Sequence, residues 1–309
     1  MKAVALTAGD PYGVGPELIA KMWHERLLPT DVKFLFYMPL SVAQFYKLPL
    51  ELICSPEMEF HFDPAKLGRL DAQAGLVSME AFRLAVTDAL AGRVAAVVTG
   101  PVNKQALALA GEKYLGHTEL LQTMTGSGEV LMGFFSPKLN VFLNSIHIPL
   151  GDVSRHVRTE KFEAHARLAV KGLRDYGIAE PRLAIAGLNP HAGENGLMGR
   201  EEQDILLPVI RKLQSEGLKI SEPLSGDTVF YRAYHGEFDG VMAMYHDQGL
   251  APLKLVAFDE AVNVTLGTSV IRTSVDHGTG FDIVGKNLAK PISFLEAIRV
   301  AKKFIDAKT

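Results

Sequence analysis

Short apolar runs alternate with amphipathic helical stretches along the chain, and this rhythm constrains the fold more than any other feature of the sequence. The apolar runs are typical of buried strands and lie at 4–6, 34–37, 95–98, 183–186 and 241–244. Stretches 72–91, 160–176 and 201–214 carry apolar residues at the spacing of one helix face. Strands that alternate with helices predict an α/β fold with a largely parallel sheet.

The middle of the chain predicts an antiparallel component. Extended runs 129–135 and 139–147 are separated by Ser136-Pro137-Lys138, which indicates a hairpin and therefore a mixed sheet. A last helix is expected at about 293–307, where apolar residues follow helical spacing. The sequence has no repeat, low-complexity tract or long flexible linker, so we expect the lobes to be interwoven.

Composition limits the class of protein. The 309 residues, 48% of them hydrophobic, can bury a sizeable core, and the length suggests two domains or lobes. A net charge of -3 without a basic stripe argues against nucleic acid or a charged membrane surface as a partner. The single Cys54 excludes an intrachain disulfide, favours a reducing compartment and is interpreted as a packing residue. Without a signal-peptide pattern or a membrane-spanning apolar run, we expect a cytoplasmic protein.

Segments rich in glycine, proline and polar residues follow several predicted strands, at the sheet edge where α/β proteins bind ligands. Segment 7–17 can bring backbone N–H groups close to an anion, although a tight strand-to-helix turn explains its glycines equally well. Segment 99–104 ends in Lys104, either an active-site cation or a surface lysine that opens a helix. In segment 116–119, Thr118 is a candidate helix cap. Segment 276–286 suits an adenosine-binding loop.

The histidines fall into groups. Those in polar surroundings are interpreted as surface residues: His24, His61, His156, His165 and His235. By contrast, His147, His191 and His246 each follow an apolar run, beside a turn-forming residue. A single histidine of this kind is usually structural, but three in one topological position indicate a catalytic metal site with open positions.

Each of these three histidines has neighbours that could orient it. Asp247 directly follows His246, and Asn189 and Glu194 flank His191. Such partners fix the tautomer and the direction of a metal-binding imidazole. Asp247 is also a candidate general base or a direct metal ligand, and spacing alone leaves these alternatives open.

Together, these motifs resemble those of the 4-hydroxythreonine-4-phosphate dehydrogenase family, in the same order and over nearly the whole chain. They are 9–17 (GDPYGVGPE), 99–101 (TGP), 116–119 (GHTE), 187–194 (GLNPHAGE), 245–249 (YHDQG) and 272–279 (RTSVDHGT). Asn103 departs from the pattern, because many relatives have histidine there. The 276–286 loop and the 9–17 segment also resemble loops of isocitrate/isopropylmalate dehydrogenases.

The family resemblance implies a two-lobed α/β fold of the isocitrate/isopropylmalate dehydrogenase type. A cofactor-binding lobe (1–125 plus 250–309) and a metal-site and dimerisation lobe (126–249) would form a homodimer. The active site would lie in the inter-lobe cleft at the dimer interface, with one metal-binding histidine supplied by the partner subunit.

The resemblance also assigns residues. His147, His191 and His246 would bind one divalent metal, with zinc expected and cobalt or magnesium as alternatives. The substrate would be bound by His117, Thr118, Lys254, Asn263 and Arg272. NAD or NADP would contact His277, Gly278, Thr279 and Asp282, and the candidates for general base are Asp247 and Lys104. Lys254 and Arg272 also stand in apolar surroundings, where a cation needs an anion, either the substrate or an internal carboxylate.

The implied reaction is oxidation and decarboxylation of 4-phosphohydroxy-L-threonine to 3-amino-2-oxopropyl phosphate in pyridoxal phosphate biosynthesis. One alternative within the family is a D-threonate or D-erythronate 4-phosphate dehydrogenase; a more distant branch oxidises an aromatic dihydrodiol. A remote alternative is a three-histidine metallohydrolase, in which the metal activates water instead of an alcohol. The 276–286 loop argues against a hydrolase, because a hydrolase has no use for a dinucleotide.

Overall fold

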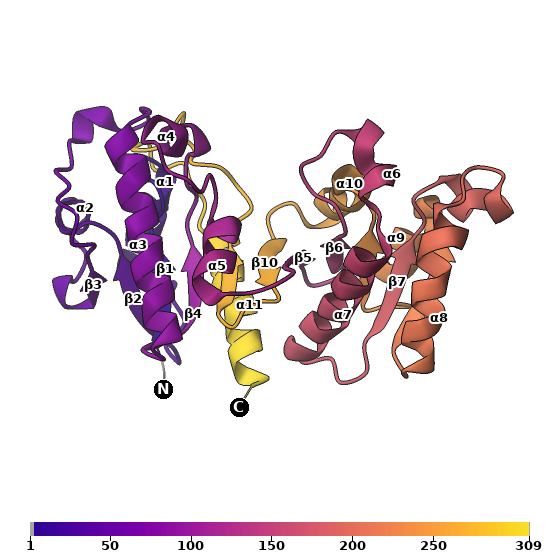
Figure 1. Cartoon of the computed structure of the whole chain (residues 1–309). Coiled ribbons are helices and arrows are strands. Elements are labelled where there is room, and N and C mark those ends of the chain that lie inside the picture. The colour runs from indigo at the N-terminus through magenta and orange to yellow at the C-terminus, as the bar shows by residue number, and fades with distance from the viewer. Residues whose placement is uncertain (1–2, 309) are drawn as a thin grey trace. The chain divides into compact units, whose positions relative to one another are not determined.

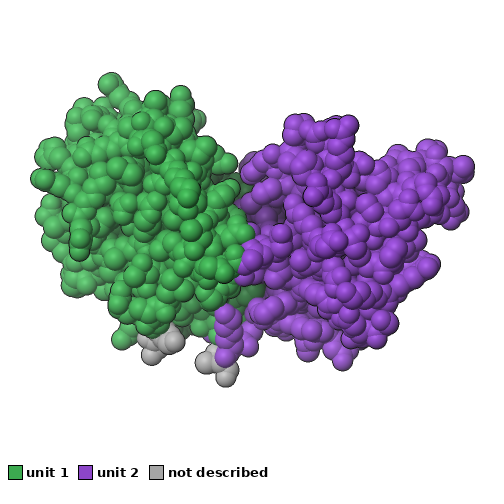
Figure 2. Space-filling model, viewed as in Figure 1, with its two compact units in different colours: residues 1–127, 268–305 green, residues 128–267, 306–309 purple. Residues whose placement is uncertain are grey.

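The computed structural model describes residues 3–308, which form two compact units (Figure 2). Unit 1 contains residues 3–127 and 268–305, and unit 2 contains 128–267 and 306–308. The predicted lobes divided the chain at 125/126 and 249/250. Residues 250–267 belong instead with unit 2, because the strand Val262–Leu266 pairs with Leu131–Phe135 in that unit.

Unit 1 is built on a parallel sheet in the order β3-β2-β1-β4-β11 (Figure 1). The strands are β1 (Ala3–Thr7), β2 (Lys33–Tyr37), β3 (Ile53–Cys54), β4 (Val94–Thr99) and β11 (Ile271–Ser274). Its helices are α1 (Val14–His24), α2 (Leu40–Phe45), α3 (Ala72–Leu90), α4 (Lys104–Leu109), α5 (His117–Thr125) and most of α11 (Ile292–Asp306), with 3-10 turns at Leu50–Leu52 and Pro64–Lys66. Apolar residues of α3 pack with those of β1 and β4 in one buried cluster.

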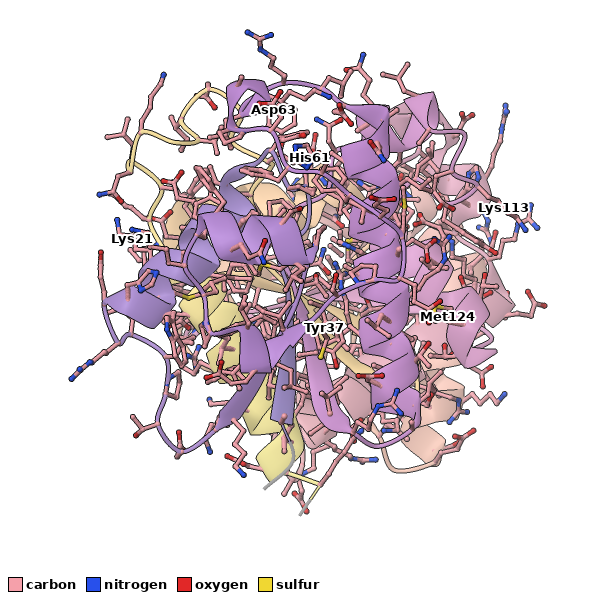
Figure 3. All side chains as sticks on the ribbon, turned by 90° about the vertical axis from the view of Figure 1, so that its left-hand side faces the viewer. Lys21, Tyr37, His61, Asp63, Lys113 and Met124 are labelled. Atoms are coloured by element: carbon pink, nitrogen blue, oxygen red, sulfur yellow. The ribbon has the colours of Figure 1, made fainter. Side chains whose placement is uncertain are left out.

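Local chemistry sets the helix ends of unit 1. The Asp71 carboxylate accepts a hydrogen bond from the Ala74 N–H at 2.9 Å and caps α3, which ends before Gly92 in the left-handed region (φ +73°). Tyr37, labelled in Figure 3, is fully buried, and its hydroxyl donates to Asp88 of α3 at 2.7 Å. Cys54 also packs against this cluster, as predicted.

Unit 2 carries the antiparallel component. Its strand order is β10-β5-β6-β9-β7-β8, and the pairs β10–β5 and β5–β6 are antiparallel whereas β6–β9, β9–β7 and β7–β8 are parallel. The strands are β5 (Leu131–Phe135), β6 (Val141–Leu143), β7 (Arg182–Ala186), β8 (Lys219–Leu224), β9 (Gly240–Ala243) and β10 (Val262–Leu266). The helices are α6 (Val153–His156), α7 (Thr159–Asp175), α8 (Leu207–Ser215), α9 (Gly226–Tyr234) and α10 (His246–Ala257); a 3-10 turn spans Leu150–Asp152.

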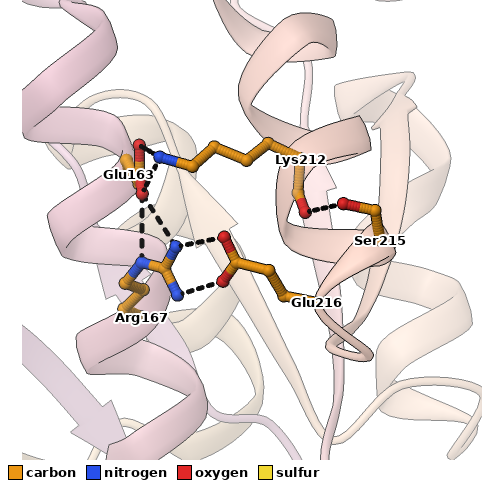
Figure 4. Close-up of polar contacts among 5 residues, drawn as sticks. All are labelled: Glu163, Arg167, Lys212, Ser215 and Glu216. Carbon is orange, nitrogen blue, oxygen red and sulfur yellow. Dashed lines mark hydrogen bonds and ion pairs between the residues drawn. The ribbon is translucent and has the colours of Figure 1, made fainter.

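An ion network joins α7 to α8 (Figure 4). Arg167 bonds to Glu163 one turn earlier at 2.8 Å and to Glu216, just past α8, at 2.6 Å. Lys212 of α8 reaches back to Glu163 at 2.8 Å. The four charges therefore tie together two helices that are far apart in the sequence.

The predicted strands and helices are confirmed within a few residues, and so is the mixed sheet. The likeness to isocitrate/isopropylmalate dehydrogenases stays a prediction from the sequence. No helix among residues 3–308 is long and apolar enough to cross a membrane. The interpretation of His165 as a surface residue is wrong: it is 4% exposed on the inner face of α7, and its Nδ1 lies 3.1 Å from the Asn144 side-chain oxygen.

Candidate active site

The three predicted metal-binding histidines follow three neighbouring parallel strands of unit 2. His147 comes four residues after β6, His246 three residues after β9, and His191 five residues after β7. In the sheet, β9 pairs with both β6 and β7. Because the carboxyl ends of parallel strands lie at one edge, the fold carries all three residues to the same edge of the sheet.

His147 and His246 form a pair. Their ring centroids are 5.7 Å apart, and both line a hollow of about 500 Å³ together with Asp247. Nδ1 of His246 lies 2.7 Å from the Asp247 carboxylate, which can only accept the hydrogen bond when ionised. Nδ1 therefore carries the proton, and Nε2 of His246 is the atom with a lone pair for a metal.

His191 is not part of this pair. It is exposed and lines a second hollow, of about 740 Å³, whose other walls include Tyr231 and Leu255. Within residues 3–308, no group of three or more histidine, cysteine or carboxylate residues is arranged to hold a metal ion. The chain therefore brings together two of the predicted ligands, and the third lines a second hollow, which shares Tyr245 with the first.

In unit 1, Arg272 lies at the centre of a buried polar cluster. The residue is 4% exposed on β11, and its Nε and Nη2 donate to the Thr99 hydroxyl at 3.1 and 2.8 Å. Nη2 also donates to Nδ1 of His117, the first residue of α5, at 3.2 Å. Burial lowers the pKa of Arg272 to about 10, and the negative charge of Glu119 opposes this shift.

His117 is fixed as a neutral imidazole in this cluster. Burial, followed by the charge of Arg272, holds the pKa of His117 well below its usual range. A guanidinium can only donate, so Nδ1 accepts and the proton is on Nε2. This Nε2 is buried and has no hydrogen-bond partner among the described residues. Arg272 and His117 together therefore offer a cation and a donor to an anion.

The other predicted substrate residues have varied surroundings. Thr118 is half-buried in the first turn of α5, but it is not the helix cap, because Gly116 holds that position. Asn263 of β10 has a buried side-chain oxygen without a partner among residues 3–308. Lys254 is half-buried on α10, with Nζ 4.9 Å from the centre of the Phe258 ring. Its apolar neighbour Leu253 is buried whereas Leu255 and Val256 are exposed, so Lys254 stands at the boundary between packed and exposed apolar residues.

The predicted cofactor loop packs against the first loop of the chain. The carbonyl of Thr279 accepts from the Val14 N–H at 2.9 Å, and Glu17 accepts from the Gly285 N–H at 2.6 Å. His277, Gly278 and Asp282 are exposed, whereas Thr279 is half-buried. Two segments that the sequence singled out separately therefore form one loop cluster.

Close packing explains two glycines of the first loop. A Cβ on Gly9 would lie 2.1 Å from the Pro101 carbonyl oxygen, and a Cβ on Gly15 would lie 1.8 Å from that of Ala8. Both glycines allow the close approach of two backbone segments. The tight-turn interpretation is therefore sufficient for these residues.

The two candidates for general base differ in position. Lys104 is exposed in the first turn of α4, where the Asn103 side chain caps the helix by accepting from the Ala106 N–H at 3.0 Å. This is the position expected of a surface lysine that opens a helix. Asp247 is 85% exposed and bonds to His246. The geometry thus gives Asp247 an orienting contact.

Two buried polar residues, Thr99 and Asp10, lie in segments that the sequence analysis singled out, but neither was predicted as a site residue. Thr99 ends β4 and binds Arg272 through its hydroxyl; a polar residue that closes a buried apolar run was the available signal. Asp10 is 1% exposed, and burial raises its pKa to about 6. One of its oxygens accepts from the Tyr12 N–H, and the other has no partner among the described residues.

Comparisons with known proteins agree on one family. The family described as "Pyridoxal phosphate biosynthetic protein PdxA" matches residues 37–301. A 4-hydroxythreonine-4-phosphate dehydrogenase of Sulfurihydrogenibium sp. is 39% identical over 97% of this chain and 98% of the relative. A D-threonate 4-phosphate dehydrogenase of Salmonella typhimurium is 40% identical, with the same shares covered. The crystal structure of a 4-hydroxythreonine-4-phosphate dehydrogenase from Klebsiella pneumoniae has a TM-score of 0.86 at 37% identity and covers 99% of this chain and 100% of its own.

Proposed function

Because the chain belongs to the PdxA family, we propose that it is a dehydrogenase dependent on NAD(P) and a divalent metal, which oxidises and decarboxylates 4-phosphohydroxy-L-threonine. The product would be 3-amino-2-oxopropyl phosphate, used in pyridoxal phosphate biosynthesis. The buried cluster of Arg272, Thr99 and His117 carries the proposal, because it offers charge and a hydrogen-bond donor to an anionic substrate.

Recognition of the substrate follows from the groups in unit 1. The Thr99 hydroxyl donates to the Thr273 carbonyl at 3.3 Å, so its oxygen is free to hold the Arg272 guanidinium by accepting from it. An anionic group of the substrate would be bound by Arg272 and by Nε2–H of neutral His117. In unit 2, Lys254 and the side-chain oxygen of Asn263 are the proposed further contacts.

The imidazoles of His147 and His246 fit a divalent metal, because they are close together and Asp247 leaves Nε2 of His246 unprotonated. His191 is the proposed third ligand. A metal held there would act as a Lewis acid that favours the alkoxide of the substrate and polarises the carbonyl formed from it. The loop 276–286, held by Val14 and Glu17, would position the nicotinamide cofactor that accepts the hydride.

We also propose a homodimer whose metal site is shared between subunits. Large apolar side chains are exposed beside both histidine hollows: Leu150 (71%) beside His147 and His246, and Tyr231 (69%) and Leu255 (87%) beside His191. A second copy that covers this surface would bury them. It would also give each pair of histidines a third ligand, the partner's His191.

Complementation tests this arrangement. His191→Ala and His246→Ala chains would each be inactive as homodimers, because every site lacks a ligand. In a mixed dimer one site regains all three histidines, so random pairing should restore about a quarter of wild-type activity. If the mixture stays inactive although mixed dimers form, the shared site is wrong.

D-threonate 4-phosphate is the second candidate substrate, because a D-threonate 4-phosphate dehydrogenase is as similar to this chain as a 4-hydroxythreonine-4-phosphate dehydrogenase. The two substrates differ in an amine or a hydroxyl beside the oxidised carbon. NADH formation from 4-phosphohydroxy-L-threonine should exceed that from D-threonate or D-erythronate 4-phosphate. A clear preference for the sugar acids would overturn the primary assignment, and phosphate-ester hydrolysis without NAD binding would overturn the dehydrogenase.

A further inference from the structure

The segment that carries His191 has a rare backbone conformation. Six successive residues, 191–196, have positive φ: His191 (51°), Ala192 (53°), Gly193 (82°), Glu194 (43°), Asn195 (55°) and Gly196 (92°). Only two of the six are glycine, and L-residues avoid this left-handed region because Cβ crowds the following carbonyl. Such a turn persists only where surrounding contacts determine it, so another part of the chain must hold it in place.

The buried carboxylate of Glu202 lies against this segment. This side chain belongs to a residue that is 2% exposed. One oxygen accepts from the Asn189 backbone N–H at 2.8 Å, and the other accepts from the Asn189 side-chain Nδ2 at 2.9 Å. The second oxygen also lies 2.8 Å from the place where a Cβ on Gly193 would be, so the carboxylate fills the concave side of the turn.

Glu202 begins an irregular stretch of helix. Residues Glu202–Leu206 form a π-helical turn that leads into α8. A π turn is a rare widening of a helix, often found at functional sites. Glu201, the preceding residue, is only half-buried and joins Asn189 Nδ2 at 2.8 Å to the Ser154 hydroxyl at 2.5 Å.

We propose that Glu202 is a positioning residue that fixes the direction of the His191 imidazole by clamping Asn189 at the start of the left-handed turn. The role of His191 as a metal ligand rests on the proposed function; the clamp on the turn does not. Glu202 touches neither substrate nor cofactor, and it acts through the backbone of residues 189–195. Loss of the clamp should relax the turn and weaken metal binding.

The two adjacent glutamates provide a matched pair of variants. In Glu202→Gln, both former partners of the carboxylate are N–H donors, so the new NH2 group faces a donor whichever way the amide is turned. In Glu201→Gln, the amide oxygen can still accept from Asn189 and the NH2 can donate to the Ser154 hydroxyl, which accepts as well. Only the first variant breaks the clamp. Glu202→Asp keeps two acceptor oxygens and serves as the conservative variant.

Two measurements on the purified full-length chain test the proposal. Hydrogen exchange of the peptide that covers 187–200 reports the turn without any metal, and titration with Co²⁺, followed by its visible absorption, reports the ligand geometry. Glu202→Gln should speed exchange in this peptide at least about tenfold and weaken Co²⁺ binding by about 10–100-fold, with a changed spectrum. Glu201→Gln should leave both readouts within about threefold of the wild type, and Glu202→Asp should restore part of the loss.

The outcomes separate the two hypotheses. Exchange in Glu202→Gln that equals the wild type would overturn the clamp. Faster exchange with unchanged Co²⁺ affinity would support the clamp and contradict His191 as a ligand. A wild type that binds no Co²⁺ would also contradict His191 as a ligand. If Glu202→Gln does not fold, Glu202→Asp decides. For this variant the clamp predicts that peptide 187–200 exchanges faster than in the wild type but more slowly than an unfolded peptide, whereas exchange in unit 1 is unchanged.

Discussion

Arg272 donates a hydrogen bond from Nη2 to Nδ1 of His117 at 3.2 Å, and this contact determines the tautomer of a buried imidazole. The guanidinium has no acceptor, so His117 must carry its proton on Nε2. The charge of Arg272 and burial both oppose a second proton. A histidine at the start of α5 therefore behaves as a permanent neutral donor rather than as an acid or a base.

We predict that His117 does not titrate near pH 6.5, the usual pKa of a histidine, in the folded protein. Its pKa is lowered well below 6.5, first by burial and then by Arg272, so the imidazole stays neutral at this pH. Nitrogen-15 NMR of histidine side chains should show a protonated Nε2 and an unprotonated Nδ1 for His117. Exposed His24 supplies the comparison spectrum. A titration of His117 close to pH 6.5 would contradict the tautomer assignment.

Arg272→Lys should raise KM for the phosphorylated substrate far more than it lowers thermal stability. The lysine keeps the positive charge, but a single ammonium cannot bond to Thr99, His117 and an anion in the planar arrangement of a guanidinium. We expect a loss of about 2–4 kcal/mol in kcat/KM, close to that for one partner of a buried charged contact. Steady-state kinetics with NAD(P) measure this loss.

Arg167→Lys is the matched control, because it makes the same substitution at a partly exposed position on α7. It should leave KM unchanged. Equal KM values for Arg272→Lys and the wild type would mean that the buried cluster does not bind substrate.

The sequence predicted most of the architecture because apolar runs and helical stripes report burial directly. Strand β4, for example, is a continuous apolar run, as expected of a strand buried on both faces. The sequence also placed His147, His191 and His246 after three strands, and the parallel pairing of β6, β9 and β7 brings them to one sheet edge.

Local sequence patterns did not predict the contacts between residues that are distant in the sequence. The left-handed turn at His191 depends on Glu202, and in 191–196 only Gly193, Gly196, His191 and Asn195 are residue types that favour or tolerate positive φ. His165 was assigned to the surface because its neighbours in sequence are polar. Its spacing from Phe162 and Ala169 on α7 nevertheless placed it on the buried stripe, so the helical period was the better guide.

Asp10→Asn should stabilise the protein at pH 8 but not at pH 4. Burial raises the pKa of Asp10 from 3.8 to about 6, so its contribution to stability is complete below pH 3.8 and is lost as the pH rises through 6. The difference between these two pKa values corresponds to about 3 kcal/mol of stability lost when the buried carboxyl ionises. An asparagine amide carries no charge and avoids this loss, and its oxygen can still accept from the Tyr12 N–H. We expect a gain of about 1–3 kcal/mol in urea unfolding at pH 8.

The pH dependence distinguishes this cause from a general change in packing. Asp259→Asn, at an exposed position, should change the free energy of unfolding by less than about 0.5 kcal/mol at either pH. A gain for Asp10→Asn that is equal at pH 4 and pH 8 would show that relief of a buried charge is not its source.

Arg167→Gln should lower the free energy of unfolding by about 1 kcal/mol at low salt and by less in 1 M NaCl. Arg167 joins α7 to the segment after α8 through Glu163 and Glu216 (Figure 4), so its loss removes contacts between helices as well as within one. Added salt screens these partly exposed charges, which reduces the difference between variant and wild type.

Arg200→Gln is the control. Among the ion pairs of the described residues, Arg200 pairs only with Asp204, one turn away, and both side chains are more than half exposed. Its cost should be about 0.3 kcal/mol. Equal costs for the two variants in urea unfolding, or a cost for Arg167→Gln that salt does not change, would mean that the network adds nothing to the packing of α7 on α8.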